Sequence, residues 1–363
     1  MHKTLALLAT LPLAAFAAEE NYFQDEDWEL LCDNTGTCRV AGYHAGIVDN
    51  DHFMSLLFER EAGENAAVRG RIGLYADNWP KHGSAPNQGE LMVDGKSLGS
   101  IALNEERIGS KVNKSNQGYD PAYGSLSAEQ TEAVLKALDG GGKITFQADN
   151  ETWTLSNLGA TAALTKMDAR QGRVNTPSAL IRRGTNKKAV PQATKKPVIR
   201  AAAVPTTPPR VLKAGDSEYS ALRTLLAQKA GEGCDKLDPA NYDDGGPTVD
   251  ITLYPLDNDN ILAEAACLEG TYNESNYYAL MSPDLKTFKG EVGDHTTSNA
   301  YSGGQIKGYQ KGRSAGDCWT GKLYTWDGKT FAKTEDYFTG QCGKEFPGGA
   351  WMLYEYTSDT TIP

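Results

Sequence analysis

Six cysteines constrain this chain of 363 residues more than any other feature of its sequence. An even number of cysteines is typical of disulfide-bonded proteins in oxidising compartments. There is no Cys-x-x-Cys pair and no histidine beside a cysteine pair, so zinc binding and thiol redox chemistry are disfavoured. Many pairings are possible, and sequence proximity favours three short loops. These candidate disulfides are Cys32–Cys38, Cys234–Cys267 and Cys318–Cys342.

The first 17 residues are typical of a Sec signal peptide. Residues 5–16 are apolar and uncharged, and Ala15-Phe16-Ala17 fits a small-x-small cleavage site. The apolar run is too short to cross a bilayer as a helix, and no other long apolar run follows. We therefore expect a periplasmic or secreted protein without a transmembrane segment.

Charge is distributed unevenly along the chain. The formal net charge of -11 argues against a general nucleic-acid binder. Residues 182–213 nevertheless hold nine Lys or Arg and five Pro without any Asp or Glu. Proline fixes φ and removes a hydrogen-bond donor, which disfavours a helix or a central strand here. We expect a basic, extended linker that is a solvated tether, or one that contacts an acidic face, anionic lipid or glycan. It would separate an N-terminal domain (18–181) from a C-terminal domain (214–363).

Turn residues between short apolar runs predict several β-hairpins. Asp94-Gly95, Asp149-Asn150, Asp257 to Asn260 and Asp327-Gly328 mark their turns. Fewer segments have helical patterns. Ser127 and Gln130 form a capping box for a helix that ends at Gly140, and helices are also expected over 160–171 and 217–230. The fold class is therefore predicted to be α+β, with two mainly antiparallel β domains of sandwich or small-barrel type. Each domain is predicted to have one or two helices, and disulfide bonds cross-link both domains internally.

No standard reactive motif is present, so we predict no catalytic residue, cofactor or metal site. His44, His52 and His82 fall in the first domain, but their spacing fits no metal motif. His44 and His52 are expected at the surface, flanking a strand start. Acidic pairs could serve a glycan hydrolase or bind calcium, but turn formation is the favoured explanation for these Asp and Asn residues. The suspects for such an enzyme are Asp243, Asp244, Asp257 and Asp259.

Aromatic residues are frequent in the C-terminal part of the chain. Tyr and Trp are enriched at recognition surfaces, and they also pack well in β-sheet cores. We expect most of them to lie in the core and an outward-facing subset to mark a binding face. The twelve residues are Tyr272, Tyr277, Tyr278, Tyr301, Tyr309, Trp319, Tyr324, Trp326, Tyr337, Trp351, Tyr354 and Tyr356.

Several short motifs resemble the bacterial domain of unknown function 1176 family, a group of exported proteins without an established activity. The N-terminal motifs are Phe23 with Trp28, Cys32-Asp33-Asn34 to Cys38, and Gly159 through Ala162-Ala163-Leu164 and Met167-Asp168 to Gln171-Gly172-Arg173. The C-terminal motifs are Cys267, Gly270-Thr271-Tyr272-Asn273, Gly312-Arg313, Gly316-Asp317-Cys318, Trp326-Asp327-Gly328 with Phe331, and Cys342 with Phe346 to Trp351. Thr271 and Gly343-Lys344 depart from the residues that are usual in this family.

The first half of the chain also resembles the invasion-associated locus B family, which implies an exported β-rich domain acting at the envelope or with a host.

The leading hypothesis is a binding protein that catalyses nothing. Its partner would be a protein or glycan in the cell envelope or outside, including an enzyme that it inhibits. An ion pair between Arg313 and Asp317 is expected to fix the loop before Cys318, and the same residues are candidates for partner contact. The full set of partner-binding candidates is Tyr272, Asn273, Arg313, Asp317 and Trp319. The alternatives are a hydrolase acting on cell-wall glycans and a structural envelope factor tethered through the basic linker.

Overall fold

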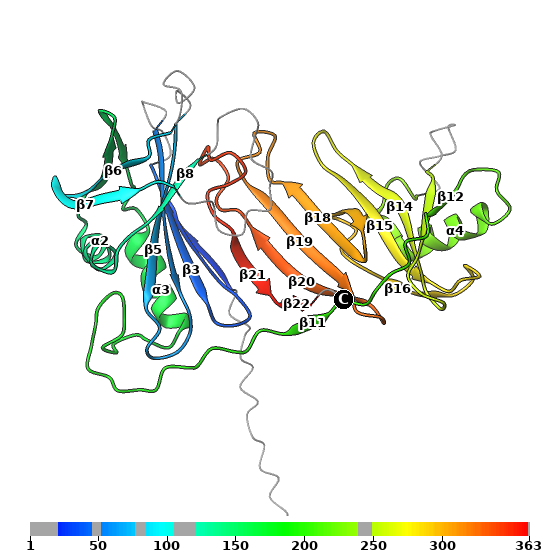
Figure 1. Ribbon diagram of the computed structural model, residues 1–363, viewed down its shortest axis with the longest axis horizontal. Coiled ribbons are helices and arrows are strands. Elements are labelled where there is room, and N and C mark those ends of the chain that lie inside the picture. Colours follow the sequence, from blue (N-terminus) through cyan, green and yellow to red (C-terminus); the bar gives the residue numbers. More distant parts are fainter. Residues whose placement is uncertain (1–20, 46–51, 77–84, 105–120, 239–248, 362–363) are drawn as a thin grey trace, which may run out of the picture.

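The computed structural model describes residues 21–45, 52–76, 85–104, 121–238 and 249–361. The fold is α+β, with mainly antiparallel sheets and three disulfides, as the sequence predicts (Figure 1). Residues 1–17, His82, Asp243 and Asp244 lie outside the described residues. Among the described helices, none has the length and apolar character needed to cross a membrane.

A six-stranded antiparallel sheet forms the centre of the N-terminal half. Its strands, in spatial order, are β1 (Tyr22–Asp25), β2 (Trp28–Cys32), β3 (Cys38–Tyr43), β4 (His52–Arg60), β5 (Val68–Ala76) and β8 (Ala122–Ser125). A four-stranded sheet lies beside it. Its order is β10 (Glu151–Thr154), β9 (Ile144–Ala148), β6 (Gln88–Val93) and β7 (Lys96–Ala102). Asp94 and Asp149 adopt positive φ in the predicted hairpin turns, which accounts for the Asp-Gly and Asp-Asn pairs there.

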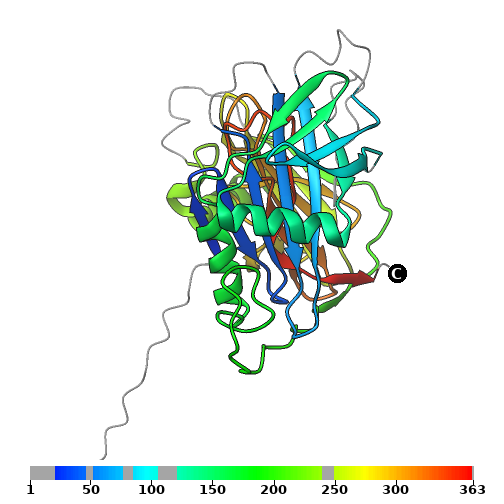
Figure 2. The same ribbon diagram turned by 90° about the vertical axis from the view of Figure 1, so that its left-hand side faces the viewer.

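Two helices cover one face of the six-stranded sheet, as Figure 2 shows. They are α2 (Ala128–Gly140) and α3 (Ala160–Arg170). The predicted capping box at Ser127 and Gln130 is present, and the backbone turns left-handed at Gly141. Both helices bury apolar side chains in the core that contains Trp28 and Phe58. This packing closes one side of the sheet.

The C-terminal half contains two five-stranded antiparallel sheets and α4 (Tyr219–Ala230), which follows the predicted pattern. The first sheet has the order β12 (Arg210–Leu212), β13 (Ile251–Pro255), β14 (Ile261–Glu269), β15 (Glu274–Met281) and β16 (Phe288–Glu291). The second has the order β17 (Ser298–Ser302), β18 (Gln305–Lys311), β19 (Trp319–Trp326), β20 (Phe331–Phe338) and β21 (Leu353–Thr357). Side chains from both sheets, including Leu262, Tyr278, Ile306 and Trp326, form one shared core.

The basic segment 182–213 runs along both halves (Figure 1). Its Thr194 N–H donates to Thr35 of the N-terminal half, and its Ala202 N–H donates to Trp326 of the C-terminal half. It contains two short strands, β11 (Val198–Arg200) and β12. β11 pairs in parallel with β22 (Asp359–Thr361), and β12 is an edge strand, so neither takes a central place in a sheet.

The cysteines form the three pairs that sequence proximity favours, Cys32–Cys38, Cys234–Cys267 and Cys318–Cys342, and none is free. Cys32–Cys38 joins the facing ends of β2 and β3. Cys234–Cys267 ties the segment after α4 to β14, and Cys318–Cys342 ties the start of β19 to the segment after β20.

The loop between β20 and β21 extends into the N-terminal half. We call residues 338–353 the docking segment. Its Phe346, Ala350, Trp351 and Leu353 lie in the same hydrophobic core as Trp28. Trp351 is fully buried, and its indole N–H donates to Ser55 Oγ on β4 at 2.6 Å. The six-stranded sheet is therefore covered on one face by helices and on the other by a segment that begins more than 200 residues after its last strand.

Candidate functional site

Four of the five predicted partner-binding residues gather around the Cys318–Cys342 disulfide. Asn273 accepts from the Lys311 N–H at 2.8 Å and donates to the Lys311 carbonyl at 2.9 Å. The Lys311 ammonium lies 5.3 Å from the centre of the Trp319 ring. Arg313 and Asp317 belong to the loop between β18 and β19, just before Cys318. The fifth residue, Tyr272, is the neighbour of Asn273 in sequence.

Asp317 holds this loop together. Its carboxylate receives two hydrogen bonds from the Arg313 guanidinium, at 2.6 and 2.8 Å, and one from the Gly343 N–H at 2.8 Å. Burial alone would raise the pKa of Asp317, but these hydrogen bonds and the positive charge of Arg313 lower it. Asp317 is only 3 % exposed, so its role is to orient Arg313 and the backbone after Cys342.

Three of the five predicted side chains remain open to solvent. Tyr272 is 43 % exposed, the Arg313 side chain is 39 % exposed, and Trp319 is half-buried. The Trp319 indole N–H donates to the Gly316 carbonyl at 2.9 Å, which fixes the plane of the ring. We call Tyr272, Asn273, Lys311, Arg313 and Trp319 the braced surface. It presents two aromatic rings and a guanidinium on a disulfide-bonded scaffold.

The other aromatic residues divide between the core and sheet faces. Tyr277, Tyr278, Trp326 and Trp351 are at most 1 % exposed and pack in the interior. The remaining residues, Tyr301, Tyr309, Tyr324, Tyr337, Tyr354 and Tyr356, are half-buried. Within this group Tyr337 and Tyr354 pair across β20 and β21 with ring centres 5.6 Å apart. Among the twelve, Tyr272 is the most exposed.

The described suspects for a hydrolase occupy a turn. Asp257 accepts from the Asp259 N–H at 2.7 Å and from the Asn260 amide at 2.9 Å. The Lys289 ammonium donates to the Asp259 carbonyl at 2.6 Å. Asp257 therefore organises the β13–β14 hairpin, which matches the turn interpretation.

The prediction that His44 and His52 lie at the surface is wrong. They do flank the start of β4, but they are only 1 % and 3 % exposed. The ring of His44 packs on Phe53, and that of His52 packs on Trp153. Apolar neighbours on the four-stranded sheet and β4 bury both rings, and hydrophobic periodicity alone did not reveal this. Within the described ranges, no three His, Cys, Asp or Glu side chains form a group that could hold a metal ion.

A second constellation, which the sequence analysis missed, lies where the docking segment meets the six-stranded sheet. Glu29 on β2 is fully buried. Its Oε1 accepts hydrogen bonds from the Tyr43 hydroxyl and, at 3.0 Å, from the Gln341 N–H of the docking segment. Burial raises the pKa of Glu29 to about 7, although the Tyr43, Tyr22 and Gln341 hydrogen bonds and the charge of Lys344 oppose this.

Gly340 allows this close contact. It adopts a φ of +101°, and a Cβ atom at this position would lie 2.3 Å from the Tyr43 hydroxyl oxygen. Only glycine satisfies both conditions without strain. A side chain here would therefore push the docking segment away from Glu29.

A buried ion pair lies beside Glu29. The Lys344 ammonium contacts the Asp27 carboxylate at 2.5 Å, and the two side chains are 8 % and 12 % exposed. Burial, followed by the charge of Lys344, lowers the pKa of His44 to about 4, while Asp27 acts in the opposite direction. We call Asp27, Glu29, Tyr43, His44, Gln341 and Lys344 the interface cluster. It combines residues from both halves of the chain.

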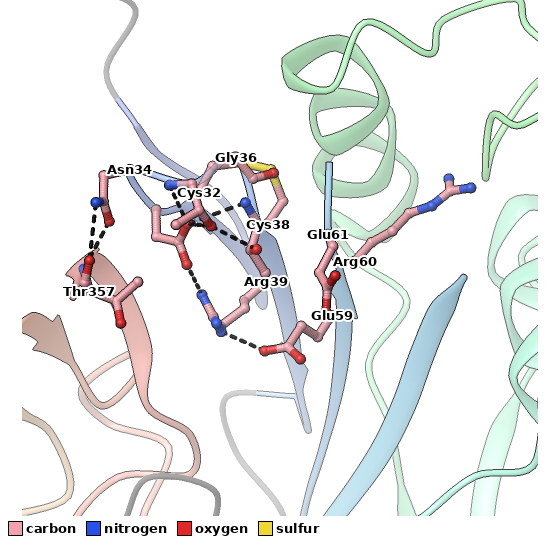
Figure 3. A network of polar contacts seen from close by, with 12 residues as sticks. Cys32, Asn34, Gly36, Cys38, Arg39, Glu59, Arg60, Glu61 and Thr357 are labelled. Atoms are coloured by element: carbon pink, nitrogen blue, oxygen red, sulfur yellow. Dashed lines mark hydrogen bonds and ion pairs between the residues drawn. A yellow bond between two sulfur atoms is a disulfide. The ribbon is translucent and has the colours of Figure 1, made fainter. Parts of the chain in front are cut away.

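The Cys32–Cys38 loop makes another contact between the halves, as Figure 3 shows. The Asn34 side chain accepts from the Thr357 N–H at 2.8 Å and donates to the Thr357 carbonyl at 3.1 Å. Arg39, just after the disulfide, bridges Asp33 and Glu59 with contacts of 2.9 and 2.8 Å. These bonds fix the disulfide loop against the end of β21.

One sequence motif indicated the docking segment, which brings Gln341 and Lys344 to the interface cluster. The motif from Phe346 to Trp351 has turn-forming Pro and Gly residues between two large apolar residues, which a simple surface loop does not require. In the structure, Phe346 and Trp351 are the anchors of the docking segment. Their partners lie some 300 residues earlier, so the motif alone does not identify them.

One of the comparisons with known proteins covers most of the chain. A family model described as a protein of unknown function (DUF1176) matches residues 22–357. No curated protein and no solved structure matches the chain. The matched range includes β1, both halves and the docking segment up to the end of β21. The chain therefore belongs to the DUF1176 family of proteins of unknown function.

Proposed function

We propose that this protein is an exported, non-catalytic binding protein that uses the braced surface to hold a protein or glycan at the cell envelope or outside. The observation that carries this proposal is that Arg313 and Trp319 are fixed by hydrogen bonds beside the Cys318–Cys342 disulfide and remain partly exposed, with exposed Tyr272 next to Asn273 in sequence. Tyr, Trp and Arg are the residues that most often dominate binding energy at protein interfaces. Tyr and Trp also stack on sugar rings.

Preorganisation supports the same function. Asp317 holds the Arg313 guanidinium through two hydrogen bonds, and the Gly316 carbonyl holds the Trp319 indole. Side chains that are already ordered lose less conformational entropy when a partner binds. A surface of this kind can occlude an enzyme or hold a ligand without moving.

The compartment is part of the proposal. Three disulfides are typical of proteins outside the reducing cytoplasm. The Sec-type segment at residues 1–17 and the apolar run within it favour export. A partner in the envelope or beyond follows from that location.

Site-specific photo-cross-linking in cells tests the proposal. A photoreactive phenylalanine analogue replaces Tyr272, and a matched control carries it at Leu158, which is 61 % exposed in the N-terminal half. We expect a discrete adduct from position 272 that is absent from position 158, with mass spectrometry showing whether it is protein or glycan. Adding R313A should weaken the adduct at least several-fold.

Two results would contradict a binding role for this surface. One is the same adduct pattern from positions 272 and 158. The other is turnover of a peptidoglycan panel by the purified protein that is lost in D257A or D259A, since this would favour the hydrolase.

A further inference from the structure

The hydrogen bonds around Glu29 serve its two carboxyl oxygens unequally. Its Oε2 lies 3.2 Å from the Tyr22 hydroxyl oxygen, which in turn lies 2.8 Å from Gln24 Oε1. A tyrosine has one hydroxyl hydrogen, and the shorter contact with Gln24 uses it. Oε2 is then left with the longer and weaker contact to this hydroxyl. A protonated Oε2 strengthens that contact, because it donates to the Tyr22 oxygen instead of sharing its hydrogen with Gln24.

The charges around Glu29 also favour a protonated carboxyl group. The nearest basic group is Lys344, and its ammonium is held by Asp27 at 2.5 Å. The described titratable groups that face this region are Tyr22 on β1, Asp27 before β2, Tyr43 and His44 at the end of β3, and Lys344 in the docking segment. A buried carboxylate without its own counter-ion is costly, and protonation removes that cost.

Glu29 also connects the two halves directly. Its Oε1 accepts the Gln341 N–H at 3.0 Å, and both groups are buried. If the docking segment leaves the sheet, Glu29 becomes accessible to water and loses this partner. The affinity of Glu29 for a proton must then differ between the docked and undocked arrangements.

We propose that seating of the docking segment is coupled to a proton on Glu29, so that the two halves hold together more firmly as the pH falls below neutral. The neutral carboxyl group accepts from Tyr43 and Gln341 through Oε1 and donates to Tyr22 through Oε2. Above neutral pH the proton leaves, and the cost of keeping an ionised carboxylate buried then favours the undocked arrangement, in which water can reach Glu29.

The direction of the pH effect on docking follows from the linkage between docking and proton binding by Glu29. The pKa of Glu29 is about 7 in the docked protein and 4.5 for an ordinary glutamate. Between these values the docked state binds the extra proton, so docking is strongest at the acidic end and weakens as the pH rises through 7. The docking equilibrium changes by up to about tenfold per pH unit in this window. His44, with a pKa of about 4, acts with the opposite sign between about pH 4 and 6.5.

Hydrogen exchange on the full-length protein, wild type and E29Q, tests the proposal. Glutamine cannot ionise, and it can still accept from Gln341 and donate to Tyr22. Protection of residues 338–353 is measured at pH 5.5 and 8 and corrected for intrinsic exchange. We expect the ratio of wild-type to E29Q protection to be at least tenfold higher at pH 5.5 than at pH 8. Taking this ratio cancels the contribution of His44.

The matched control is E59Q, which removes another carboxylate from the same sheet, one paired with Arg39 and Arg69. It should leave the pH dependence unchanged. A wild-type to E29Q ratio that is equal at both pH values overturns the proposal.

A second measurement does not depend on how well E29Q folds. In wild-type protein labelled with ¹³C at the glutamate side-chain carboxyl carbon, one resonance should titrate near pH 7. If no glutamate carboxyl titrates above pH 6, the proposal is wrong.

Discussion

The six-stranded sheet of the N-terminal half and the second five-stranded sheet of the C-terminal half differ in how their faces are covered. Every residue of β2 in the N-terminal sheet is buried, because helices cover one face and the docking segment covers the other. In β18 of the C-terminal sheet, buried Ile306 and Gly308 alternate with half-exposed Lys307 and Tyr309. The N-terminal sheet thus depends on residues from the far end of the chain. The C-terminal sheet keeps one side available for solvent or a partner.

The strongest test of this comparison is W351A. Trp351 belongs to the C-terminal half by sequence, but its side chain fills the N-terminal core and bonds Ser55. Removing a buried Trp side chain leaves a cavity, and we expect the free energy of unfolding to fall by about 3–5 kcal/mol. Urea unfolding measures this, and hydrogen exchange should show the loss in β4 and β5.

The control is W319A on the half-exposed side of the molecule, which should cost much less. Equal losses in the two variants would mean that the docking segment does not stabilise the N-terminal sheet.

The next largest effect is expected from C318S/C342S. This disulfide spans 24 residues and anchors the docking segment next to Gln341, whereas Cys32–Cys38 spans only six. The chain-entropy model predicts a loss of about 3 kcal/mol for the longer loop and about 2 kcal/mol for C32S/C38S. Denaturant unfolding of both double variants gives the comparison, and the reverse order would contradict it.

A smaller effect with the opposite pH sign is expected in the C-terminal half. Asp294 contacts Lys322 at 2.6 Å, between the two five-stranded sheets. Burial raises the pKa of Asp294, but the Lys322 hydrogen bond and the other donors outweigh this and lower it to about 2. Because this pKa is depressed, the pair stabilises the fold above about pH 4, and the contribution is lost as the pH falls towards 2.

We therefore expect D294N to reduce the free energy of unfolding by about 1 kcal/mol at pH 6, since the pair is partly exposed to solvent. The difference should shrink at pH 3. A constant difference across this range, measured by thermal or urea unfolding, would show that the charge of Asp294 is not involved.

The smallest effect on stability concerns R313K. Lysine keeps the charge but cannot form the two-point contact that Arg313 makes with Asp317. Because Arg313 is 39 % exposed, we expect only about 0.5 kcal/mol in unfolding experiments. Cross-linking from position 272 should fall far more than stability does. A loss of stability that matches the loss of cross-linking would assign Arg313 a purely structural role.

Local signals predicted the local structure well. The Ser127 capping box, the Asp-Gly turns and the three nearest-neighbour disulfides all depend on residues close in sequence. Arg313 and Asp317, four residues apart, form the expected ion pair. The weaker similarity to the invasion-associated locus B family and the domain boundaries remain predictions.

Long-range contacts were the source of every error and omission. His44 and His52 looked like surface residues because nothing nearby indicates which side chains will cover them, and both are buried. Glu29 looked like one more polar residue in a strand, yet it is the fully buried acceptor for Gln341, 312 residues away. Strand periodicity describes which side of a sheet a residue occupies, and it does not say what covers that side.

By itself the sequence determined the α+β class, the hairpins and helices, the three disulfides and membership of the family, because turn chemistry, helix capping and loop closure act over short separations. Only the tertiary structure decided that residues 338–353 complete the N-terminal core and that Glu29, Asp27 and Lys344 become buried there. The physical reason is that burial depends on which distant surfaces meet, and the energy of a charged group depends on that burial.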